Sequence, residues 1–192
     1  MNTLERAEQT GTGTSATGPA GGDLAGNYPN PILKSVVTAG SYQRVEVDAK
    51  GRAISGTPYR RFHLTKNGAL TVVAGVQTDL TGWTTVENAG GFSLSSNVVT
   101  ITNAGTYNIT LAATFENNST GQRMIGVSFS NGRIFRTVSP SNAVNAHVTT
   151  VLASLNSINI AAGETITLTV RQESGGSLAI NAANTYFSIQ SA

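Results

Sequence analysis

The most regular hydrophobic pattern in the chain lies between residues 106 and 115. Apolar positions alternate there with small or polar ones, and the apolar set is Tyr107, Ile109, Leu111, Ala113 and Phe115. Side chains of a β-strand point to opposite faces with a period of two, so this alternation predicts a strand with one face in a hydrophobic core. The other face would be small and uncharged, with Thr106, Asn108, Thr110, Ala112 and Thr114.

Similar patterns recur at short intervals through residues 59–192. Residues 125–129 alternate again, and Asn131-Gly132 favours a type I′ hairpin turn into the next strand. Further strands are predicted over residues 148–155 with 158–160, 166–170 and 186–189, whereas helical spacing appears nowhere over a comparable length. We therefore expect an all-β domain of about eight to ten strands, most simply a jelly-roll sandwich of two sheets.

The composition of the chain changes near Pro58. Residues 1–58 hold nine of the 21 glycines and four of the five prolines. Residues that precede proline are biased towards extended conformations, and we expect no ordered pleated structure before Val36. Residues 41–57 alternate around a Lys50-Gly51 turn, which predicts a β-hairpin.

This hairpin would be marginal in water by itself and would need partner chains to cover its few aliphatic side chains, which are Val45, Val47 and Ile54. We accordingly divide the chain into three predicted parts. Residues 1–22 form an N-terminal arm, residues 23–58 a slender stem and residues 59–192 a compact C-terminal knob.

Charge is sparse and unevenly placed. Only 11% of the residues are charged, against about 25% in an ordinary soluble domain. Apart from His147, no charged residue lies between Arg136 and Glu164, and none follows Glu173. Two interpretations fit. The chain is either a secreted or virion β-protein whose surface consists of Thr, Ser and Asn, or a chain whose faces are covered by copies of itself.

Composition also excludes several kinds of partner and chemistry. The absence of cysteine removes disulfides, thiolate chemistry and Cys-ligated zinc. A net charge of +2 without a basic run gives no reason to expect nucleic acid as a partner. No apolar run approaches the roughly 18 residues that a membrane span needs, so no membrane partner is expected.

Two segments of the N-terminal part resemble a motif pair that recurs in bacteriophage fibre proteins. The segments are GPAGGDLAGNYPNPIL and VEVDAKGRAISGT, within residues 18–57. The family's form is roughly GGDLxGxYPNPxV followed by VxxDxKGRVxxGT. The chain departs from it at Ala53-Ile54, where a Val usually stands. The resemblance implies a trimeric fibre stem.

The C-terminal part is similar to the jelly roll shared by tumour necrosis factor and complement C1q. The residues that carry the similarity, in the family's order, are Ala104 to Tyr107, Ser130 to Gly132, Ala162 to Ile166, and Tyr186 to Ile189. One departure is Glu164, where the C1q branch usually has Asp, and a collagen stalk is absent. The resemblance implies a homotrimer, with an interface that we place at Thr106, Asn108, Thr110, Ala112, Thr114 and Tyr186.

Residues suited to catalysis or metal binding are few. No serine lies in a GxSxG motif, and the two histidines, His63 and His147, lack a His, Asp or Glu at ligand spacing. We expect neither an enzyme nor a cofactor or metal site within one chain. A threefold assembly would nevertheless turn one histidine into three ligands, so an ion on the axis stays an alternative.

Four side chains are candidates for a surface binding site. Trp83, the only tryptophan, would be a stacking residue if exposed, and otherwise packs under the first strands. Arg123, Arg133 and Arg136 cluster in or beside the central hairpin and are the candidates for a polar binding patch, the alternative being simple solvation.

The sequence thus favours a structural virion protein of a bacteriophage, a trimeric fibre or spike on the head or the tail. Leu4, Glu5 and Arg6 in the arm are the candidate anchor to a capsid or tail protein, and the knob would contact a glycan or protein of the host surface. The alternative is a capsid decoration or cement protein without a receptor role.

Overall fold

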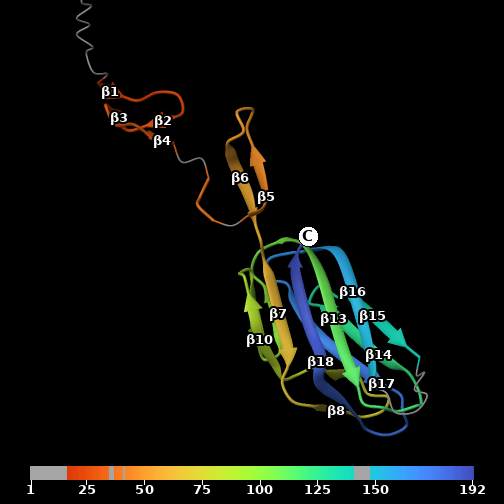
Figure 1. Cartoon of the computed structure of the whole chain (residues 1–192). Coiled ribbons are helices and arrows are strands. Elements are labelled where there is room, and N and C mark those ends of the chain that lie inside the picture. Colours follow the sequence, from red (N-terminus) through yellow and green to blue (C-terminus); the bar gives the residue numbers. More distant parts are fainter. Residues whose placement is uncertain (1–16, 35–36, 41, 141–147) are drawn as a thin grey trace, which may run out of the picture. The chain divides into compact units, whose positions relative to one another are not determined.

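A computed structural model describes residues 17–34, 37–40, 42–140 and 148–192 (Figure 1). The chain divides into two compact units, Met1–Pro58 and Tyr59–Ala192. Every regular element within the described ranges is a β-strand. The prediction of an all-β chain is therefore confirmed.

The N-terminal unit begins with two pairs of very short antiparallel strands. Their bounds are Gly18–Pro19 (β1) with Asn27–Tyr28 (β3), and Leu24–Ala25 (β2) with Ile32–Leu33 (β4). The expectation that no pleated structure precedes Val36 is wrong. Gly22 and Gly26, with φ of +66° and +83°, let the chain reverse between two-residue strands, which are too short to leave an alternating pattern in the sequence.

The pairing of β1 with β3 also places the predicted division between arm and stem inside a paired segment. Gly18 lies opposite Tyr28, and Pro19 lies opposite Asn27. Residues 18–22 therefore belong structurally with the stem. The predicted anchor residues Leu4, Glu5 and Arg6 lie outside the described residues.

The predicted hairpin is present as Tyr42–Val47 (β5) and Ala53–Pro58 (β6). Its turn is built by Asp48, whose Oδ1 accepts the backbone N–H groups of Lys50 (2.9 Å) and Arg52 (3.0 Å), while Gly51 adopts φ of +78°. Gly56 leaves room for the ring of Tyr42, because a Cβ at residue 56 would lie 2.3 Å from that ring. Asp48, Gly51 and Gly56 of the second motif thus have local structural reasons.

The C-terminal unit is a sandwich of two antiparallel six-stranded sheets (Figure 1). The first sheet has the order β10-β7-β18-β13-β16, and β8 also pairs with β18. The bounds of its strands are Arg61–Lys66 (β7), Leu70–Val72 (β8), Trp83–Asn88 (β10), Gly105–Phe115 (β13), Thr149–Ile160 (β16) and Leu178–Ser191 (β18).

The second sheet has the order β11-β12-β17-β14-β15, with β9 also paired to β17. The bounds of its strands are Thr78–Asp79 (β9), Phe92–Ser95 (β11), Val98–Ile101 (β12), Arg123–Phe129 (β14), Ile134–Ser139 (β15) and Thr165–Gln172 (β17). Sequence neighbours such as β13 and β14 lie in opposite sheets, as the chain of a jelly roll requires.

The hydrophobic core lies between the two sheets. The predicted apolar face of β13 is buried there, with each of its five side chains at 1% exposure or less. Phe92 of the second sheet stacks on Phe62 with ring centroids 5.6 Å apart, and meets the ring of Tyr107 edge-on at 5.5 Å. Aromatic packing of this kind joins the two sheets, and of the three rings Tyr107 was predicted to face the interior from the period-two pattern.

The central hairpin differs from the prediction in its turn type. Gly132 has φ of +89°, but Asn131 is absent from the positive-φ residues, so the turn is not type I′. The N–H of Gly132 donates to the carbonyl of Phe129 and that of Phe129 to Arg133, which describes a three-residue loop closed by the glycine. The conformation with two successive positive φ angles occurs instead at Ser96 and Asn97, between β11 and β12.

None of the described residues of the N-terminal unit is buried, and its aliphatic side chains are exposed, with Leu33 at 77% and Val47 at 55%. We therefore expect residues 59–192 to fold when expressed alone and residues 1–58 to stay unfolded, because only the first fragment carries a core. Circular dichroism of the two fragments measures this. An unfolded fragment 59–192 would contradict the division at Pro58.

Candidate functional site

The outer face of the first sheet is the candidate site, because small and uncharged side chains predominate on it. It consists of the side chains that alternate with the buried ones along β13, β18, β7 and β16. Register aligns them in rows across the strands. One row is Thr84, Thr65, Tyr186, Ala112 and Leu152, and the next is Glu87, His63, Ser188, Thr110 and Ser154.

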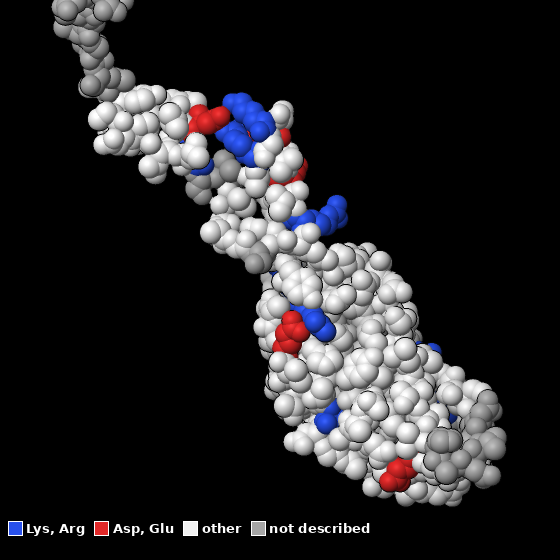
Figure 2. Space-filling view, viewed as in Figure 1, with Lys and Arg blue, Asp and Glu red and all other residues white. Residues whose placement is uncertain are grey.

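These two rows are nearly free of charge. Glu87 is the charged residue in them, and its carboxylate pairs with Arg61 of the neighbouring strand at 3.2 Å. Figure 2 shows that the side of the unit turned to the viewer, over β7, β18 and β13, is almost entirely uncharged. Leu152, on the edge strand β16 at the end of the first row, is 54% exposed beside this largely uncharged surface. Depletion of charge around an exposed aliphatic side chain is typical of the core of a protein interface.

The predicted interface residues all lie on this face, because Tyr186 is the register partner of Ala112 and the others belong to β13. They are not equally accessible. Ala112 and Thr114 are already covered within one chain, at 1% and 2% exposure. Thr114 Oγ1 lies 2.9 Å from Thr150 Oγ1, and its N–H donates to Thr185 Oγ1 at 3.0 Å. Whether these residues meet another chain stays a prediction.

Sequence reasoning missed Leu152 and the position of His63 on this face. The alternation of residues 148–155 contains the signal for Leu152, since it shares a face with Thr150 and Ser154. The ring of His63 lies 5.8 Å from that of Tyr186, and its buried Nδ1 has no hydrogen-bond partner. Within the described residues no group of three or more His, Asp or Glu lies together, and His147 falls outside them.

Arg123 is not a surface residue, so its prediction as part of a binding patch is wrong. Its exposure is 0%. The guanidinium donates to the backbone carbonyls of Asn118 and Thr120 at 2.9 Å each, and lies 5.9 Å from the centre of the Phe115 ring. Burial lowers the pKa of this guanidinium. The loop that precedes β14 wraps its carbonyl groups around the cation.

Trp83 is also buried, at 9% exposure, and belongs to the core. Its Nε1–H donates to the carbonyl of Leu80 at 2.8 Å. Of the two interpretations of Trp83, the structure favours packing under the strands. The alternative interpretation, that Trp83 is an exposed stacking residue, is therefore wrong.

Arg133 and Arg136 lie on different surfaces and form no common patch. The guanidinium of Arg133 pairs with Glu164 at 2.8 Å, donates to the carbonyl of Asn159 and lies 4.7 Å from the centre of the Phe129 ring. This cluster lines an open hollow of about 610 Å³ at one end of the sandwich. Its polar groups bind one another, because Glu164 Oε2 also accepts the N–H of Ala161. The two carboxylate oxygens of Glu164 therefore bind one partner each.

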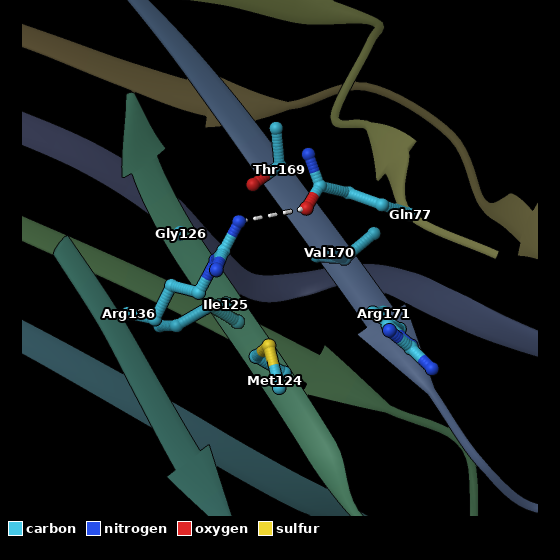
Figure 3. Close-up of a pocket in the computed structure, with 8 residues that line it drawn as sticks. All are labelled: Gln77, Met124, Ile125, Gly126, Arg136, Thr169, Val170 and Arg171. Carbon is cyan, nitrogen blue, oxygen red and sulfur yellow. Dashed lines mark hydrogen bonds between the residues drawn. The ribbon is translucent and has the colours of Figure 1, made fainter. Parts of the chain in front are cut away.

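Arg136 lies on the outer face of the second sheet, where its guanidinium extends over Gly126 (Figure 3). Its Nη2 donates to Gln77 Oε1 at 3.4 Å, and the side chain is exposed.

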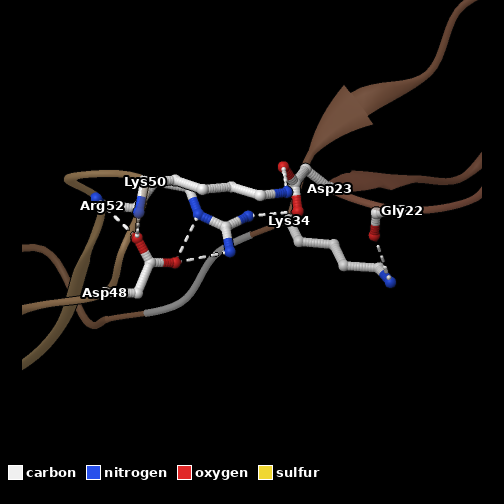
Figure 4. A network of polar contacts seen from close by, with 6 residues as sticks. All are labelled: Gly22, Asp23, Lys34, Asp48, Lys50 and Arg52. Atoms are coloured by element: carbon white, nitrogen blue, oxygen red, sulfur yellow. Dashed lines mark hydrogen bonds and ion pairs between the residues drawn. The ribbon is translucent and has the colours of Figure 1, made fainter.

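The charged residues of the two N-terminal motifs contact one another (Figure 4). Asp23 of the first motif pairs with Lys50 (3.0 Å) and Arg52 of the second, and Arg52 also pairs with Asp48 at 2.6 Å. Hydrogen bonds from Lys50 and then Arg52 lower the pKa of the Asp23 carboxyl, and those from Arg52 lower the pKa of Asp48. The network gives a physical reason for the two motifs to occur together in one chain.

Comparison with solved structures identifies the fold. Murine APRIL, in a crystal structure at pH 8.0, matches 70% of this chain and 99% of its own length with a TM-score of 0.55 and 16% identity. The Eiger TNF of S. frugiperda matches 70% of this chain and 93% of its own length, with a TM-score of 0.55 and 13% identity. The likeness concerns the fold, and it confirms the prediction of a TNF-like jelly roll.

No protein-family model matches the chain, and no curated protein sequence does either. The described residues contain no helix that is long and apolar enough to cross a membrane.

Proposed function

We propose that this chain is the protomer of a trimeric bacteriophage fibre or spike. Its N-terminal segment attaches the trimer to the head or tail of the virion, residues 17–58 form the stem, and the TNF-like unit is displayed as a knob for contact with the host surface. Display of three identical surfaces lets individually weak contacts add up by avidity.

The observation that carries this proposal is the organisation of the N-terminal unit. The residues by which it resembles phage fibre stems are those that build the hairpin turn and the Asp23–Arg52–Asp48 network. The same unit buries no described side chain and exposes Ile32, Leu33 and Val45. A segment with specific local order but no core of its own is suited to association with identical copies.

The TNF-like unit supports a trimer through a separate feature. The outer face of its first sheet carries few charges and presents Leu152 and Tyr186 in one row. In a closed ring of three, this face of each copy would meet a different surface of the next copy, and closure leaves neither surface open to further growth.

Attachment through the N-terminus can be measured with particles assembled without this chain. We expect the purified full chain to co-sediment with such particles, whereas a variant lacking residues 2–16 remains a folded trimer in the supernatant. Ending the deletion before Gly18 keeps the pairing of β1 with β3 intact. The sequence of residues 2–16 offers too few apolar side chains to form a core, so the entropy cost of ordering this segment can be offset only by contacts with a partner. Deleting the segment removes those contacts and should abolish attachment.

Normal attachment of the shortened trimer would show that the stem or knob docks, and would favour the cement interpretation over the fibre. Failure of the full chain to attach to any phage particle would contradict the proposal that it is a virion protein. Sedimentation of the unattached fraction provides the control that both proteins are trimeric.

A further inference from the structure

The chain contains two Asn-Gly dipeptides, Asn67-Gly68 and Asn131-Gly132. The first lies in the loop that joins β7 to β8, and the second in the loop that joins β14 to β15 (Figure 1). All four residues are exposed, and each glycine has a positive φ, +72° at Gly68 and +89° at Gly132. Residue type and exposure therefore do not distinguish the two dipeptides, whereas their hydrogen bonds do.

An asparagine followed by glycine carries an electrophile and a nucleophile side by side. The electrophile is Cγ of the side-chain amide, and the nucleophile is the backbone nitrogen of the glycine, which can bond to Cγ and close a cyclic imide. Glycine favours this step because it has no Cβ to obstruct the approach and adopts most backbone conformations. The rate within a folded protein then depends on whether the two groups are free to reach each other.

At the second dipeptide both groups are held by hydrogen bonds. Oδ1 of Asn131 accepts the backbone N–H of Arg133 at 3.0 Å and the Nε–H of the same residue at 3.2 Å. The N–H of Gly132 donates to the carbonyl of Phe129 at 3.0 Å. The guanidinium of Arg133 is itself fixed by its ion pair with Glu164. Ring closure at Asn131 therefore requires that several hydrogen bonds break first.

At the first dipeptide the reacting groups are left to solvent. Among the described residues, neither the side chain of Asn67 nor the N–H of Gly68 has a hydrogen-bond partner. A Cβ at Gly68 would meet no atom within 4 Å, so the space beside the nucleophile is open. The N–H of Asn67 donates to the carbonyl of Gly82 at 2.6 Å, which fixes the backbone before the side chain but not the side chain itself.

We propose that Asn67 is a site of spontaneous deamidation in the folded protein and that Asn131 is protected from the same reaction. The nitrogen of Gly68 gives up its proton and bonds to Cγ of Asn67, and the side-chain nitrogen takes up that proton and leaves as ammonia. Water then opens the cyclic imide at either of its carbonyls, which yields aspartate or isoaspartate at residue 67. No oxidant or reductant takes part.

Both products alter the loop between β7 and β8. Each adds a negative charge, and isoaspartate also inserts a further carbon into the main chain after residue 67. This change falls beside two contacts with the segment before β10, because Lys66 Nζ donates to the carbonyl of Thr81 at 2.8 Å and Asn67 donates to Gly82. The loop is thus a place where the protein changes with age, and this property goes beyond the proposed function.

Mass spectrometry of proteolytic peptides measures both dipeptides in one sample. The folded full chain is incubated in mildly alkaline buffer prepared with ¹⁸O-enriched water, because loss of the glycine proton is favoured there and ring opening incorporates the heavy oxygen. We expect the peptide with Asn67 to gain the deamidation mass and heavy oxygen about tenfold faster, or more, than the peptide with Asn131, where hydrogen bonds to a charged side chain must break first.

The unfolded chain and two variants are the controls. In denaturant the two dipeptides should react at similar rates, because the hydrogen bonds that distinguish them are lost. Arg133→Lys keeps the charge but removes the Nε donor, so deamidation of Asn131 in the folded chain should become about threefold faster. Asn67→Gln should remove the reaction at residue 67 and leave the rate at Asn131 unchanged. Circular dichroism shows whether each variant is folded.

Equal rates at the two dipeptides of the folded chain would overturn the proposal, as would a folded chain that is unreactive at Asn67 over a period in which the unfolded chain reacts. A difference that persists in denaturant would overturn the hydrogen bonds as its cause. An unchanged rate at Asn131 in folded Arg133→Lys would overturn the protective role of that side chain. None of these measurements depends on attachment to particles, so they are independent of the proposed fibre function.

Discussion

We expect the Leu152→Arg variant to sediment as a monomer at concentrations where the parent chain is a trimer. Leu152 is 54% exposed in the single chain and lies in one row with Ala112, Tyr186 and Thr65. If this face is the contact between copies, each substituted chain places an unpaired cation in a buried interface. A buried charge without a partner costs about 3–5 kcal/mol, and each 1.4 kcal/mol or so changes an association constant tenfold.

Leu152 is a sharper probe than Ala112, the most central of the small residues on this face. Ala112 is 1% exposed within one chain, so a larger side chain there would disturb the chain's own packing as well as any interface. The matched control is Ile134→Arg on the other sheet, since Ile134 is similarly exposed at 50%. Analytical ultracentrifugation with a circular dichroism check separates the two effects. A folded trimer of Leu152→Arg would exclude this face as the contact.

The alternation along the chain predicted which side chains enter the core, but not which residues from different strands meet. Residues 107–115 were assigned correctly to two faces because the period of a strand depends only on local geometry. Register depends on bulges, and β13 has one on each side, between Tyr107 and Ile109 towards β16 and between Ala112 and Thr114 towards β18. The rows that bring His63 and Leu152 onto one face therefore needed the structure.

In the N-terminal unit, too, local features could be predicted from the sequence and contacts between distant residues could not. The hairpin and its turn at Lys50-Gly51 follow from local sequence, because Asp48 and Gly51 act within five residues of each other. The link from Asp23 to Lys50 joins residues 27 positions apart, and no periodicity encodes such a contact. The two-residue strands before Val36 were missed for a related reason, since glycine conformations rather than side-chain patterns determine them.

Arginine positions were the least predictable part of the candidate site. Arg123, Arg133 and Arg136 are close in sequence, yet one is enclosed by a loop, one pairs with Glu164 and one lies over Gly126. A basic residue at the start of a strand is usually solvated. Arg123 is buried instead, because the backbone carbonyls of the preceding loop point at its guanidinium. Composition carries no information on the direction of these carbonyls.

We expect Arg123→Ala to destabilise the C-terminal unit by about 2–5 kcal/mol, which corresponds to a fall of roughly 10 °C in the melting temperature. The guanidinium donates to four carbonyls, those of Asn118, Thr120, Gly121 and Gln122. Removing it leaves these acceptors without their donor and opens a cavity beside the Phe115 ring.

Two further variants separate the causes of this loss. Arg123→Met retains an apolar stem against Phe115 but no donors, so its loss should lie between that of Arg123→Ala and the parent chain. Arg136→Ala removes an equal charge from an exposed side chain and should change stability by less than about 0.5 kcal/mol. Chemical denaturation of the three variants measures these differences. A loss below about 1 kcal/mol for Arg123→Ala would mean that the loop carbonyls find other donors, and that the buried cation does not hold the loop before β14 in place.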